Sequence, residues 1–416
     1  MGDLVAVLGG AGFIGSWTVD LLLEKGYDVR ILDSLQPRVH PLGKPDWVPK
    51  EAEFIQGSCA NPGSLSFALR GVKFVYHLAA YQDYLPEFSQ FIINNAESAA
   101  LLWELVVANP REYPVEKMIF ASSQAVCGEG KYACLYCTGE KLGMTGPVVP
   151  VRIPIEGDGL SVTYVPEPRS IGQLEAGDWE VRCPKCAAEM VPMLIPEDVV
   201  SPGTVYGISK YAIELMADRL GHKYGIPTVC MRYSYVQGPR NSFYNAYSGI
   251  ARRFALRLLA GLPPVVYEDG RQLRDYCNVK DVAAANWLVL EDPRADHQVF
   301  QVGGGRGITV LEFARLMIKE FGLDLEPEVP GLFREGDTRH TVSDISKIRR
   351  AVGWWPTIPV AQNVSEYVNW IRTQKVEFND VERADNIMRQ QGVVRQVDRG
   401  LKRWHYDKGD KSNGDV

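Results

Sequence analysis

The stretch LVAVLGGAGFIGSWTVDLLLEKGYDVRILDS, residues 4–34, constrains the fold more than any other part of this 416-residue chain. Residues 4–8 form an apolar run of strand length, and residues 13–25 carry apolar side chains at helical spacing. Gly26 marks the end of that helix, and residues 29–33 predict the next strand. A strand, a glycine turn, a helix and a second strand in this order predict a parallel α/β unit.

The same alternation continues along the chain. The sequence predicts strands over residues 53–58, 74–80 and 117–123, and helices over residues 62–70 and 96–108. Strands that alternate with helices predict a doubly wound parallel sheet of the Rossmann type. A smaller carboxyl-terminal lobe is expected beyond this sheet.

The glycine turn has the spacing of a dinucleotide-binding fingerprint. Gly10, Gly12 and Gly15 fit GxGxxG, and Gly9, Gly12 and Gly15 fit GxxGxxG. Glycine allows the tight turn, the approach of a pyrophosphate and close packing of the helix on its strand. A plain glycine turn is the alternative, but the required strand–turn–helix context is present, and Phe13 and Ile14 begin the helix beside the expected cofactor.

Asp33 ends the second strand and supplies the acidic residue of the fingerprint. It follows Gly15 by 18 positions (33 − 15), close to the expected spacing for a carboxylate that binds the adenosine ribose hydroxyls. A carboxylate there repels a 2′-phosphate, so the sequence favours NAD over NADP. Arg38 lies nearby and keeps NADP as an alternative.

Tyr206 and Lys210 form a YxxxK pair at the start of an amphipathic helix. Residues four apart share one helix face, and an ammonium beside a phenol is expected to lower the phenol pKa. A phenolate is a competent general base for a hydroxyl proton. A surface Tyr–Lys pair is the alternative for the motif alone, which gains meaning beside the glycine fingerprint and FASSQAVCG, residues 120–128.

With these motifs the chain resembles the extended short-chain dehydrogenase/reductase family, and within it the NAD-dependent nucleotide-sugar epimerases and dehydratases. The resemblance covers roughly residues 3–130 and 197–375, and rests on GGAGFIG, VYHLAA, FASSQAVCG, YGISK, MRYSYVQGPR, GRQLRDYCNVKDVA and TRHTVSDISKIRRAVGWWP. It implies NAD as cofactor, a nucleotide-sugar substrate and a homodimer formed through the helices near Ala96 and Ser209. A cytoplasmic location is expected because MGDLVAVLGG lacks the basic segment and the long apolar core of a signal peptide.

The resemblance also implies roles for individual residues. Ser123 and Tyr206 are the catalytic hydroxyl and acid/base, and Lys210 binds the nicotinamide ribose. The remaining expected cofactor residues are Ser58, Leu78, Ala79, Ala80 and Asn95, and the expected substrate residues are Ser123, Gln124, Arg274 and Arg339. Arginine suits the substrate diphosphate because its planar fork binds phosphate oxygens in pairs.

Four positions depart from the family pattern. Ser58 replaces a frequent Asp at the adenine, Cys127 a frequent Tyr, Tyr235 a substrate-contacting Asn, and Asn278 a frequent His. Three of these departures concern the region around the substrate, so the expected cofactor site is better defined than the expected substrate site.

The residues after Ser123 narrow the expected reaction. The dehydratases and decarboxylases that the chain resembles carry an acid two positions after the catalytic hydroxyl, where this chain has Ala125. Enzymes that epimerise next to the ketone use an added cysteine, and Cys127 is displaced from that place. Inversion at C4 through a transient 4-ketone needs no further acid or base. The motifs also resemble a subgroup acting on deoxysugar nucleotides such as dTDP-rhamnose.

Three other functions stay open. A dehydrogenase or ketoreductase would use the same residues on a similar nucleotide sugar, and a dehydratase would need a further acid/base pair. A dinucleotide sensor without catalysis is the third alternative; sensors in the family tend to lose the Tyr or the Lys, and this chain keeps both.

An insertion of residues 131–196 separates Ser123 from Tyr206. It opens with Cys134 and Cys137 and closes with Cys183 and Cys186, two CxxC pairs of the kind that hold one tetrahedral zinc. A redox CxxC and coincidence are the alternatives, and neither explains two pairs that bracket one insertion. Four cysteines leave no open position for water, so zinc is expected to be structural in a zinc-ribbon-like unit.

Zinc ribbons often bind nucleic acid, but the charge of this one argues against that role. Residues 131–195 carry six Lys/Arg and eight Asp/Glu, and the whole chain has a formal charge of −6. No apolar run is expected to span a membrane. The expected organisation is a Rossmann core over 1–130 and 197–240, the insertion, a substrate lobe over 241–375, and an added helix with a disordered tail over 376–416.

Overall fold

The computed structural model describes residues 2–83, 85–137, 162–242, 244, 249–375 and 389–397. Its largest element is a seven-stranded sheet of order β3-β2-β1-β4-β5-β9-β13, in which every neighbouring pair is parallel. The strands are β1 (Leu4–Leu8), β2 (Asp28–Asp33), β3 (Glu53–Gln56), β4 (Phe74–His77), β5 (Lys117–Ser123), β9 (Thr228–Tyr233) and β13 (Gln298–Val302). The predicted doubly wound Rossmann sheet is confirmed.

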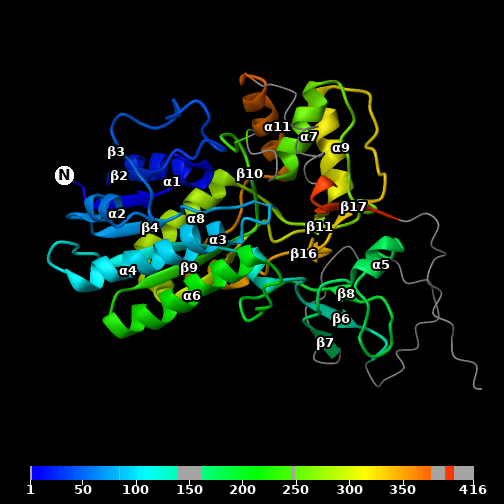
Figure 1. Cartoon of the computed structure of the whole chain (residues 1–416), viewed down its shortest axis with the longest axis horizontal. Helices are drawn as coiled ribbons and strands as arrows, with labels where there is room; N and C mark the ends of the chain where they lie inside the picture. Colours follow the sequence, from blue (N-terminus) through cyan, green and yellow to red (C-terminus); the bar gives the residue numbers. More distant parts are fainter. Residues whose placement is uncertain are drawn as a thin grey trace, which may run out of the picture.

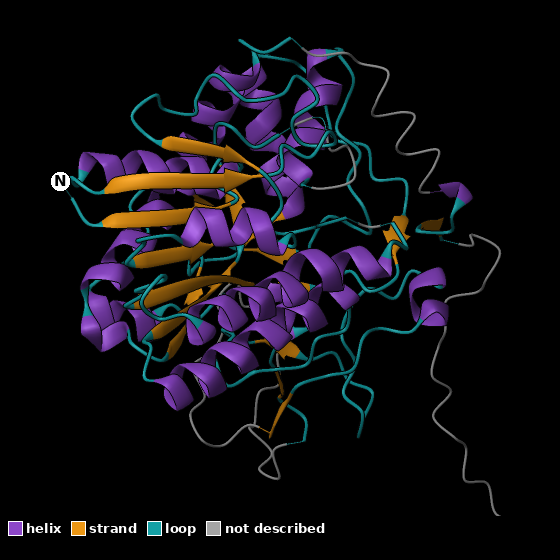
Figure 2. Ribbon diagram, turned by 60° about the vertical axis from the view of Figure 1, so that its left-hand side comes forward, coloured by secondary structure: helices purple, strands orange, loops and turns teal. Residues whose placement is uncertain are grey.

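Helices cover both faces of this sheet (Figure 2). The helices around the sheet are α1 (Phe13–Glu24), α2 (Pro62–Leu69), α3 (Phe88–Phe91), α4 (Ser98–Ala108), α6 (Val205–Tyr224), α8 (Val279–Glu291) and α10 (Ser346–Val352). Short irregular helices are the π-helix Ile92–Glu97 and the 3₁₀ turns Gln124–Cys127 and Pro293–Ala295.

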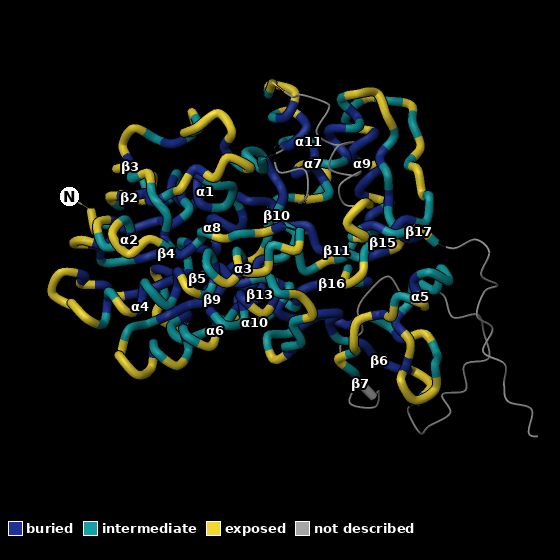
Figure 3. The backbone as a smooth tube through the Cα atoms, viewed as in Figure 1, coloured by how far each residue is buried: buried dark blue, intermediate teal, exposed yellow. Residues whose placement is uncertain are grey.

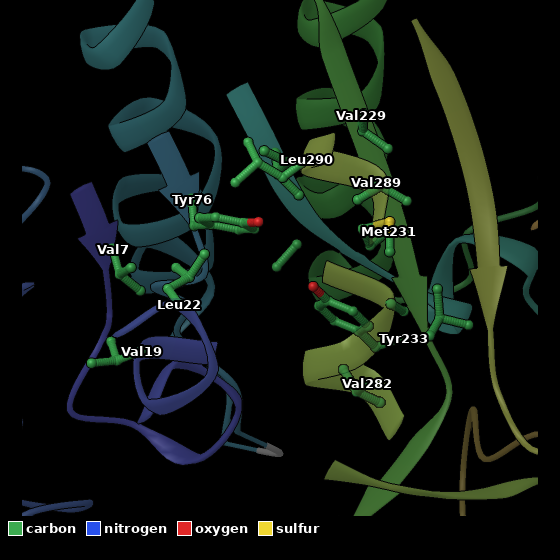
Figure 4. Packing of buried hydrophobic residues seen from close by; sticks show 14 of the residues in the cluster. Val7, Val19, Leu22, Tyr76, Val229, Met231, Tyr233, Val282, Val289 and Leu290 are labelled. Carbon is green, nitrogen blue, oxygen red and sulfur yellow. The ribbon is translucent and has the colours of Figure 1, made fainter. Parts of the chain in front are cut away.

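Strand β1 shows how the pleat divides the core. Val5 and Val7 pack on one face with α1, α8 and α10, whereas Ala6 and Leu8 pack on the other with α2, α4 and α6. Alternate residues of a strand point to opposite faces, so an apolar run buries both. Figure 4 shows the first face, where Tyr76 lies near Val7 and Leu22, and the Tyr76 hydroxyl donates to the Asn286 carbonyl at 2.8 Å.

The carboxyl-terminal lobe packs beside the sheet (Figure 1). Its core is formed by three amphipathic helices, α7, α9 and α11. The lobe and its edges contain β10 (Tyr235–Gln237), α7 (Ile250–Leu259), β11 (Leu273–Arg274), β12 (Tyr276–Asn278), β14 (Ile308–Thr309), α9 (Val310–Phe321), β15 (Leu332–Arg334), β16 (His340–Thr341), α11 (Val360–Ile371) and β17 (Val394–Gln396).

The described part of the insertion is a small separate unit beside the lobe. It contains β6 (Tyr132–Cys134), β7 (Val162–Tyr164), α5 (Ile171–Glu175) and β8 (Val191–Pro192), with β6 in the middle of a three-stranded sheet. Its buried apolar cluster has five members, Tyr132, Cys134, Val181, Cys183 and Met190. Figure 3 shows how little of this unit is buried beyond β6, so its own core contributes little to its stability.

The structure bears on two expectations about helices. Of the helix predicted over residues 376–394, residues 376–388 lie outside the described residues; Arg389 and Gln390 are helical, and the chain then turns into the strand β17 at Val394. The expected disordered tail also lies outside them from residue 398. The helical run Phe88–Ala108 is by length and composition apolar enough to cross a membrane, which the sequence reading did not anticipate. Its Leu102, Trp103 and Val106 pack into the core beneath the sheet.

Candidate functional site

A cleft of about 1300 Å³ opens at the carboxyl ends of β1, β2, β4, β5 and β9. Open α/β sheets bind ligands at this edge because the loops of several strands meet there. The cleft contacts most of the predicted site residues: Gly9, Gly12, Phe13, Ile14, Gly15, Asp33, Ser58, Leu78, Ala79, Ala80, Ser123, Gln124, Tyr206, Lys210 and Arg274. Asn95, Arg339 and the four cysteines do not line it.

The glycine turn forms a cradle that larger side chains would fill. A Cβ on Gly9 would lie 2.7 Å from the Ala79 nitrogen, and one on Gly15 would lie 2.1 Å from the Gly9 carbonyl oxygen. Gly9 also has φ +85°, a conformation that favours glycine. Gly12 is the N-cap of α1 and has no side chain to cap the first turn, so free N–H groups face the cleft. This geometry fits a pyrophosphate.

Asp33 closes the cradle on its other side. Its carboxylate accepts hydrogen bonds from the backbone N–H groups of Ala11 at 3.0 Å and Leu35 at 2.9 Å, and it faces the cleft. Arg38 is paired with Asp83 at 2.8 Å and with Glu87 at 2.9 Å. Because its charge is already balanced by two carboxylates, Arg38 is a poor partner for a 2′-phosphate.

Ser123, Tyr206 and Lys210 come together from two elements. Ser123 ends β5, and α6 begins at Val205, so Tyr206 and Lys210 lie on its first turns. The Ser123 hydroxyl lies near enough to the Tyr206 phenol to lower its pKa. The Lys210 ammonium donates to the Ala121 carbonyl at 2.8 Å and lies 5.9 Å from the centre of the Tyr206 ring.

The direction of the Tyr206 pKa differs from the sequence-based expectation. Burial raises the pKa of Tyr206 to about 12, while the nearby Ser123 hydroxyl acts in the opposite direction. Burial also lowers the pKa of Lys210 to about 8. In the protein alone, loss of solvation therefore outweighs the effect of the neighbouring lysine, and further positive charge is needed to make the phenolate available.

Asn95 lies behind the cleft and connects two elements that border it. It sits in the π-helix Ile92–Glu97, is fully buried, and accepts a hydrogen bond from the Tyr81 N–H at 2.7 Å. Its amide nitrogen donates to the Tyr81 carbonyl at 3.2 Å and to the Ser209 hydroxyl at 2.9 Å. Asn95 therefore joins the loop after β4 to α6, next to Lys210, and acts on the site through its neighbours.

Gln124 lines the cleft, and its amide is held by a buried polar network. It donates to the Ser343 hydroxyl at 3.1 Å and accepts from the Ser234 hydroxyl at 3.2 Å. Behind it lies Asp275, whose pKa burial raises to about 6. Gln124 is thus fixed in orientation, and the surface it offers a substrate is rigid.

Arg274 lines the cleft, and its positive charge is available to bind an anion. Its guanidinium donates to the carbonyls of Leu273, Arg339 and Thr338 at 2.7 to 2.9 Å and lies 5.0 Å from the centre of the Tyr235 ring. Among the described residues, no carboxylate lies within ion-pair distance of Arg274. A buried cation held only by dipoles and an aromatic face is suited to bind an anion.

Arg339 does not reach the cleft, which corrects the sequence-based expectation. It is fully buried, and its guanidinium pairs with Glu180, Glu268 and Asp269. The cleft instead contacts Arg334, which the sequence analysis missed. Gly336, at φ +80°, turns the chain between the two arginines and sends them in different directions.

Two of the residues that depart from the family pattern, Cys127 and Asn278, have a structural role. Cys127 is fully buried beside Arg232 and Gln301 and does not line the cleft. Asn278 caps α8 by accepting a hydrogen bond from the Lys280 N–H at 2.8 Å. Both residues serve the fold at positions where the sequence alone left a substrate role open.

The four cysteines of the insertion converge on one point. Their sulfur atoms all lie within 4.8 Å of one another, with Cys134–Cys186 and Cys137–Cys183 at 3.6 Å and Cys137–Cys186 at 3.5 Å. These separations far exceed a disulfide bond of about 2.05 Å. They are close to the edge of about 3.8 Å of a tetrahedron with metal–sulfur bonds of about 2.3 Å.

Backbone N–H groups support this arrangement. The Tyr136 N–H points at the Cys134 sulfur, and the N–H groups of Lys185 and Cys186 point at the Cys183 sulfur. Such N–H groups stabilise thiolate ligands, so the donor set fits a zinc ion held by four thiolates.

A buried ionic cluster joins the insertion to the carboxyl-terminal lobe. Arg169 of the insertion pairs with Glu268 of the lobe at 3.0 Å, and Glu180 of the insertion pairs with Arg339 and with His340 at 3.1 Å. Removing one partner of a buried pair costs about 3–5 kcal/mol, because the other charge stays buried. Residues 168–171 also line the cleft, so this clamp positions part of the cleft wall.

The chain is similar to known proteins over most of its length. The model of the NAD dependent epimerase/dehydratase family matches residues 5–150 and 188–303, and the unmatched 151–187 falls within the predicted insertion. A dTDP-L-rhamnose 4-epimerase from Burkholderia thailandensis is 29% identical over 378 residues, covering 89% of this chain and 95% of the relative. A UDP-glucose 4-epimerase from Halalkalibacterium halodurans is 26% identical, covering 88% of this chain and 95% of the relative.

Solved structures give the same result. The UDP-glucose 4-epimerase of Thermotoga maritima, solved with UDP-glucose, has a TM-score of 0.67 at 27% identity and covers 89% of this chain and 98% of its own. The Thermus thermophilus UDP-glucose 4-epimerase complex with NAD has a TM-score of 0.63 at 26% identity and covers 89% of this chain and 100% of its own. With a family match over more than half of its length, this chain belongs to the NAD-dependent epimerase/dehydratase family.

Proposed function

We propose that this protein is an NAD-dependent nucleotide-sugar epimerase that inverts C4 through a transient 4-keto sugar. The observation that carries the proposal is that Ser123, Tyr206 and Lys210 line the same cleft as the glycine cradle. A relative and a solved structure that match this chain over 89% of its length are 4-epimerases by name, which supports the same reaction.

The cofactor is assigned to the cradle side of the cleft. Gly9, Gly12 and Gly15 receive the pyrophosphate, and Asp33 receives the adenosine ribose. Ser58, Leu78, Ala79 and Ala80 line the same wall. NAD held there would take up a hydride from the sugar carbon, and the NADH so formed would return the hydride to the ketone.

Side chains of the protein accept and return the hydroxyl proton of the sugar. Tyr206 takes the hydroxyl proton of the sugar and later returns it, and Ser123 holds the same oxygen by a hydrogen bond. Lys210 binds the nicotinamide ribose and places a positive charge beside the phenol. Because burial raises the pKa of Tyr206 to about 12, the positive charge of a bound oxidised nicotinamide ring would favour formation of the phenolate.

Arg274 is assigned to the substrate diphosphate. Replacing Arg274 by alanine should raise KM for the nucleotide sugar about 10- to 100-fold, because a charge-assisted contact to phosphate is lost. Steady-state kinetics measure this, and NAD binding should be unchanged. Arg271→Ala is the matched control, since Arg271 lies exposed three residues away. An R274A enzyme with wild-type KM would remove this residue from the substrate site.

The residues that follow Ser123 favour inversion over dehydration as the reaction. Position 125 holds alanine, and the neighbouring Glu129, which lines the cleft, has its carboxylate engaged by the Arg339 N–H and the Tyr132 hydroxyl. Burial raises the pKa of Glu129. A dehydrogenase or ketoreductase is the second candidate, because it would use the same three residues.

The sugar is assigned to the deoxysugar class. The match to a dTDP-L-rhamnose 4-epimerase over 95% of that relative supports dTDP-rhamnose or a close analogue as substrate. Incubation with a panel of dTDP- and UDP-linked sugars, analysed by NMR, tests the proposal. We expect interconversion of one 4-epimer pair without net reduction of NAD; net NADH formation would indicate a dehydrogenase instead.

The insertion is assigned one structural zinc ion, held by Cys134, Cys137, Cys183 and Cys186. Support comes from the tetrahedral spacing of the sulfurs and from the small core of the unit. The other four cysteines are buried and separate from this cluster, and the reduced ligand set fits a cytoplasmic protein.

A homodimer is proposed through α3, α4 and α6. Exposed large apolar residues, with exposed fractions between 42% and 59%, lie on α3 (Phe88), on the π-helix that leads into α4 (Ile92) and on α6 (Ile208 and Leu215). Exposed apolar patches of this kind mark interfaces. Sedimentation analysis should give twice the mass of the chain, and a monomer at micromolar concentration would contradict the assignment.

A further inference from the structure

The described residues 389–397, here called the strap, form an extra edge on the carboxyl-terminal lobe. Strand β17 of the strap pairs antiparallel with β15, with Val394 opposite Arg334 and Gln396 opposite Leu332. The two strands lie side by side in Figure 3. The strap comes after the matched family region, which ends at residue 303.

Three contacts hold the strap in place. Val394 is buried against Leu332, and the Val397 N–H donates to the Gly331 carbonyl at 3.0 Å. Arg395 forms an ion pair of 3.6 Å with Glu175 in α5 of the insertion. The strap therefore connects the lobe with the insertion at the mouth of the cleft.

The turn before β17 contributes directly to the cleft. Gln391, Gly392 and Val393 line it, and Val393 packs in one apolar group with Val265 and Tyr267. Gly392 has φ +69°, which lets the chain turn there. The strap is thus a wall of the cleft as well as a support for β15.

The arginine side chains beside the strap indicate which part of a nucleotide sugar the strap contacts. The guanidinium of Arg334 lies 5.2 Å from the centre of the Tyr267 ring, and that of Arg253 lies 5.7 Å from it. Arg274, Tyr206 and this region all line the same cleft. In a nucleotide sugar, the diphosphate separates the sugar from the nucleoside. With the sugar assigned to Tyr206 and the diphosphate to Arg274, the part of the cleft at Tyr267 and the strap is left for the nucleoside.

We propose that the strap turn, through Val393 and Gln391, determines which nucleobase the enzyme accepts. This rests on the proposed function, because it assumes a nucleotide sugar in the cleft. Val393 supplies an apolar contact beside the aromatic Tyr267, and Gln391 supplies an amide donor and acceptor at the rim.

Direct binding of free nucleoside diphosphates to the full-length protein tests the strap without requiring turnover. Val393→Ala should weaken dTDP and UDP binding about 5- to 20-fold, the range expected when apolar contact is removed from a pocket. Val393→Phe should narrow the base end, so that ADP and GDP lose more affinity than dTDP and UDP. Calorimetry measures both variants.

Gln396→Ala is the matched control, because Gln396 lies on the same strand, is exposed and does not line the cleft. Its nucleoside diphosphate affinities should equal those of wild type. Unchanged affinities and unchanged base preference in both Val393 variants would overturn the inference while leaving the epimerase proposal intact. A wild-type protein that binds no nucleoside diphosphate and no nucleotide sugar would instead overturn the proposed function together with it.

Discussion

Replacing Tyr206 by phenylalanine is expected to reduce kcat by about 1000-fold or more while NAD stays bound. The change removes one oxygen, the atom proposed to accept the substrate proton, and general acid–base catalysis supplies about 100- to 10,000-fold. The aromatic ring and its edge contact with Phe91, at 6.3 Å, are preserved. Steady-state turnover of the accepted nucleotide sugar measures the loss, and cofactor content is determined on the same sample.

The pH dependence provides a second readout of the same residue. Burial raises the pKa of Tyr206 to about 12, so the reactive phenolate is the minor form near neutrality and its fraction grows as pH rises. The wild-type kcat should therefore increase with pH above neutrality, and the residual activity of Y206F should lack this dependence. Tyr211→Phe, one turn further along α6, is the control. A Y206F protein with full activity would show that another group moves the proton, and a dinucleotide sensor would lose none of its function.

Replacing Cys186 by serine is expected to release the zinc ion and raise KM for the nucleotide sugar about tenfold or more. The insertion has a small core of its own, so metal binding supplies much of its folding free energy. Without the metal, the insertion no longer holds Arg169 and Glu180 in position to pair with Glu268 and Arg339. The cleft wall at residues 168–171 then becomes less ordered. Metal analysis of the purified protein and substrate kinetics measure the two effects.

Lys185→Ser gives the matched control, because Lys185 is exposed and adjacent to Cys186. It should keep one zinc per chain and the wild-type KM. NAD binding should survive in C186S, since the cysteines do not line the cleft and the cradle lies in the Rossmann core. Loss of NAD binding together with zinc would contradict the separation of the scaffold from the chemistry.

The core of the fold was predictable because each element carries its own pattern. The apolar runs at β1 and β5 are buried on both faces, as a central parallel strand requires, and the glycine turn has few alternatives. The π-helix around Asn95 was missed, because its cause is tertiary: the side chain of Asn95 reaches the Tyr81 backbone and Ser209. The strand β17 was not predicted, since its pairing with β15 decides its structure.

The cofactor side of the site was more predictable than the substrate side. Gly9, Gly15 and Asp33 belong to one continuous stretch, so their spacing defines their geometry. Arg334 and Arg339 differ by only five positions in one loop, and the turn at Gly336 decides which of them faces the cleft. Similarly, the net effect on the Tyr206 pKa depends on burial, which a helix-face argument does not contain.

Inversion by internal return of the hydride is the central claim, and substrate carrying deuterium on C4 tests it most directly. In ordinary water, NMR should show the inverted epimer with deuterium still on C4. In the converse experiment, unlabelled substrate in heavy water should acquire no deuterium on carbon. Loss of the C4 label, or uptake of solvent deuterium at a neighbouring carbon, would contradict the account.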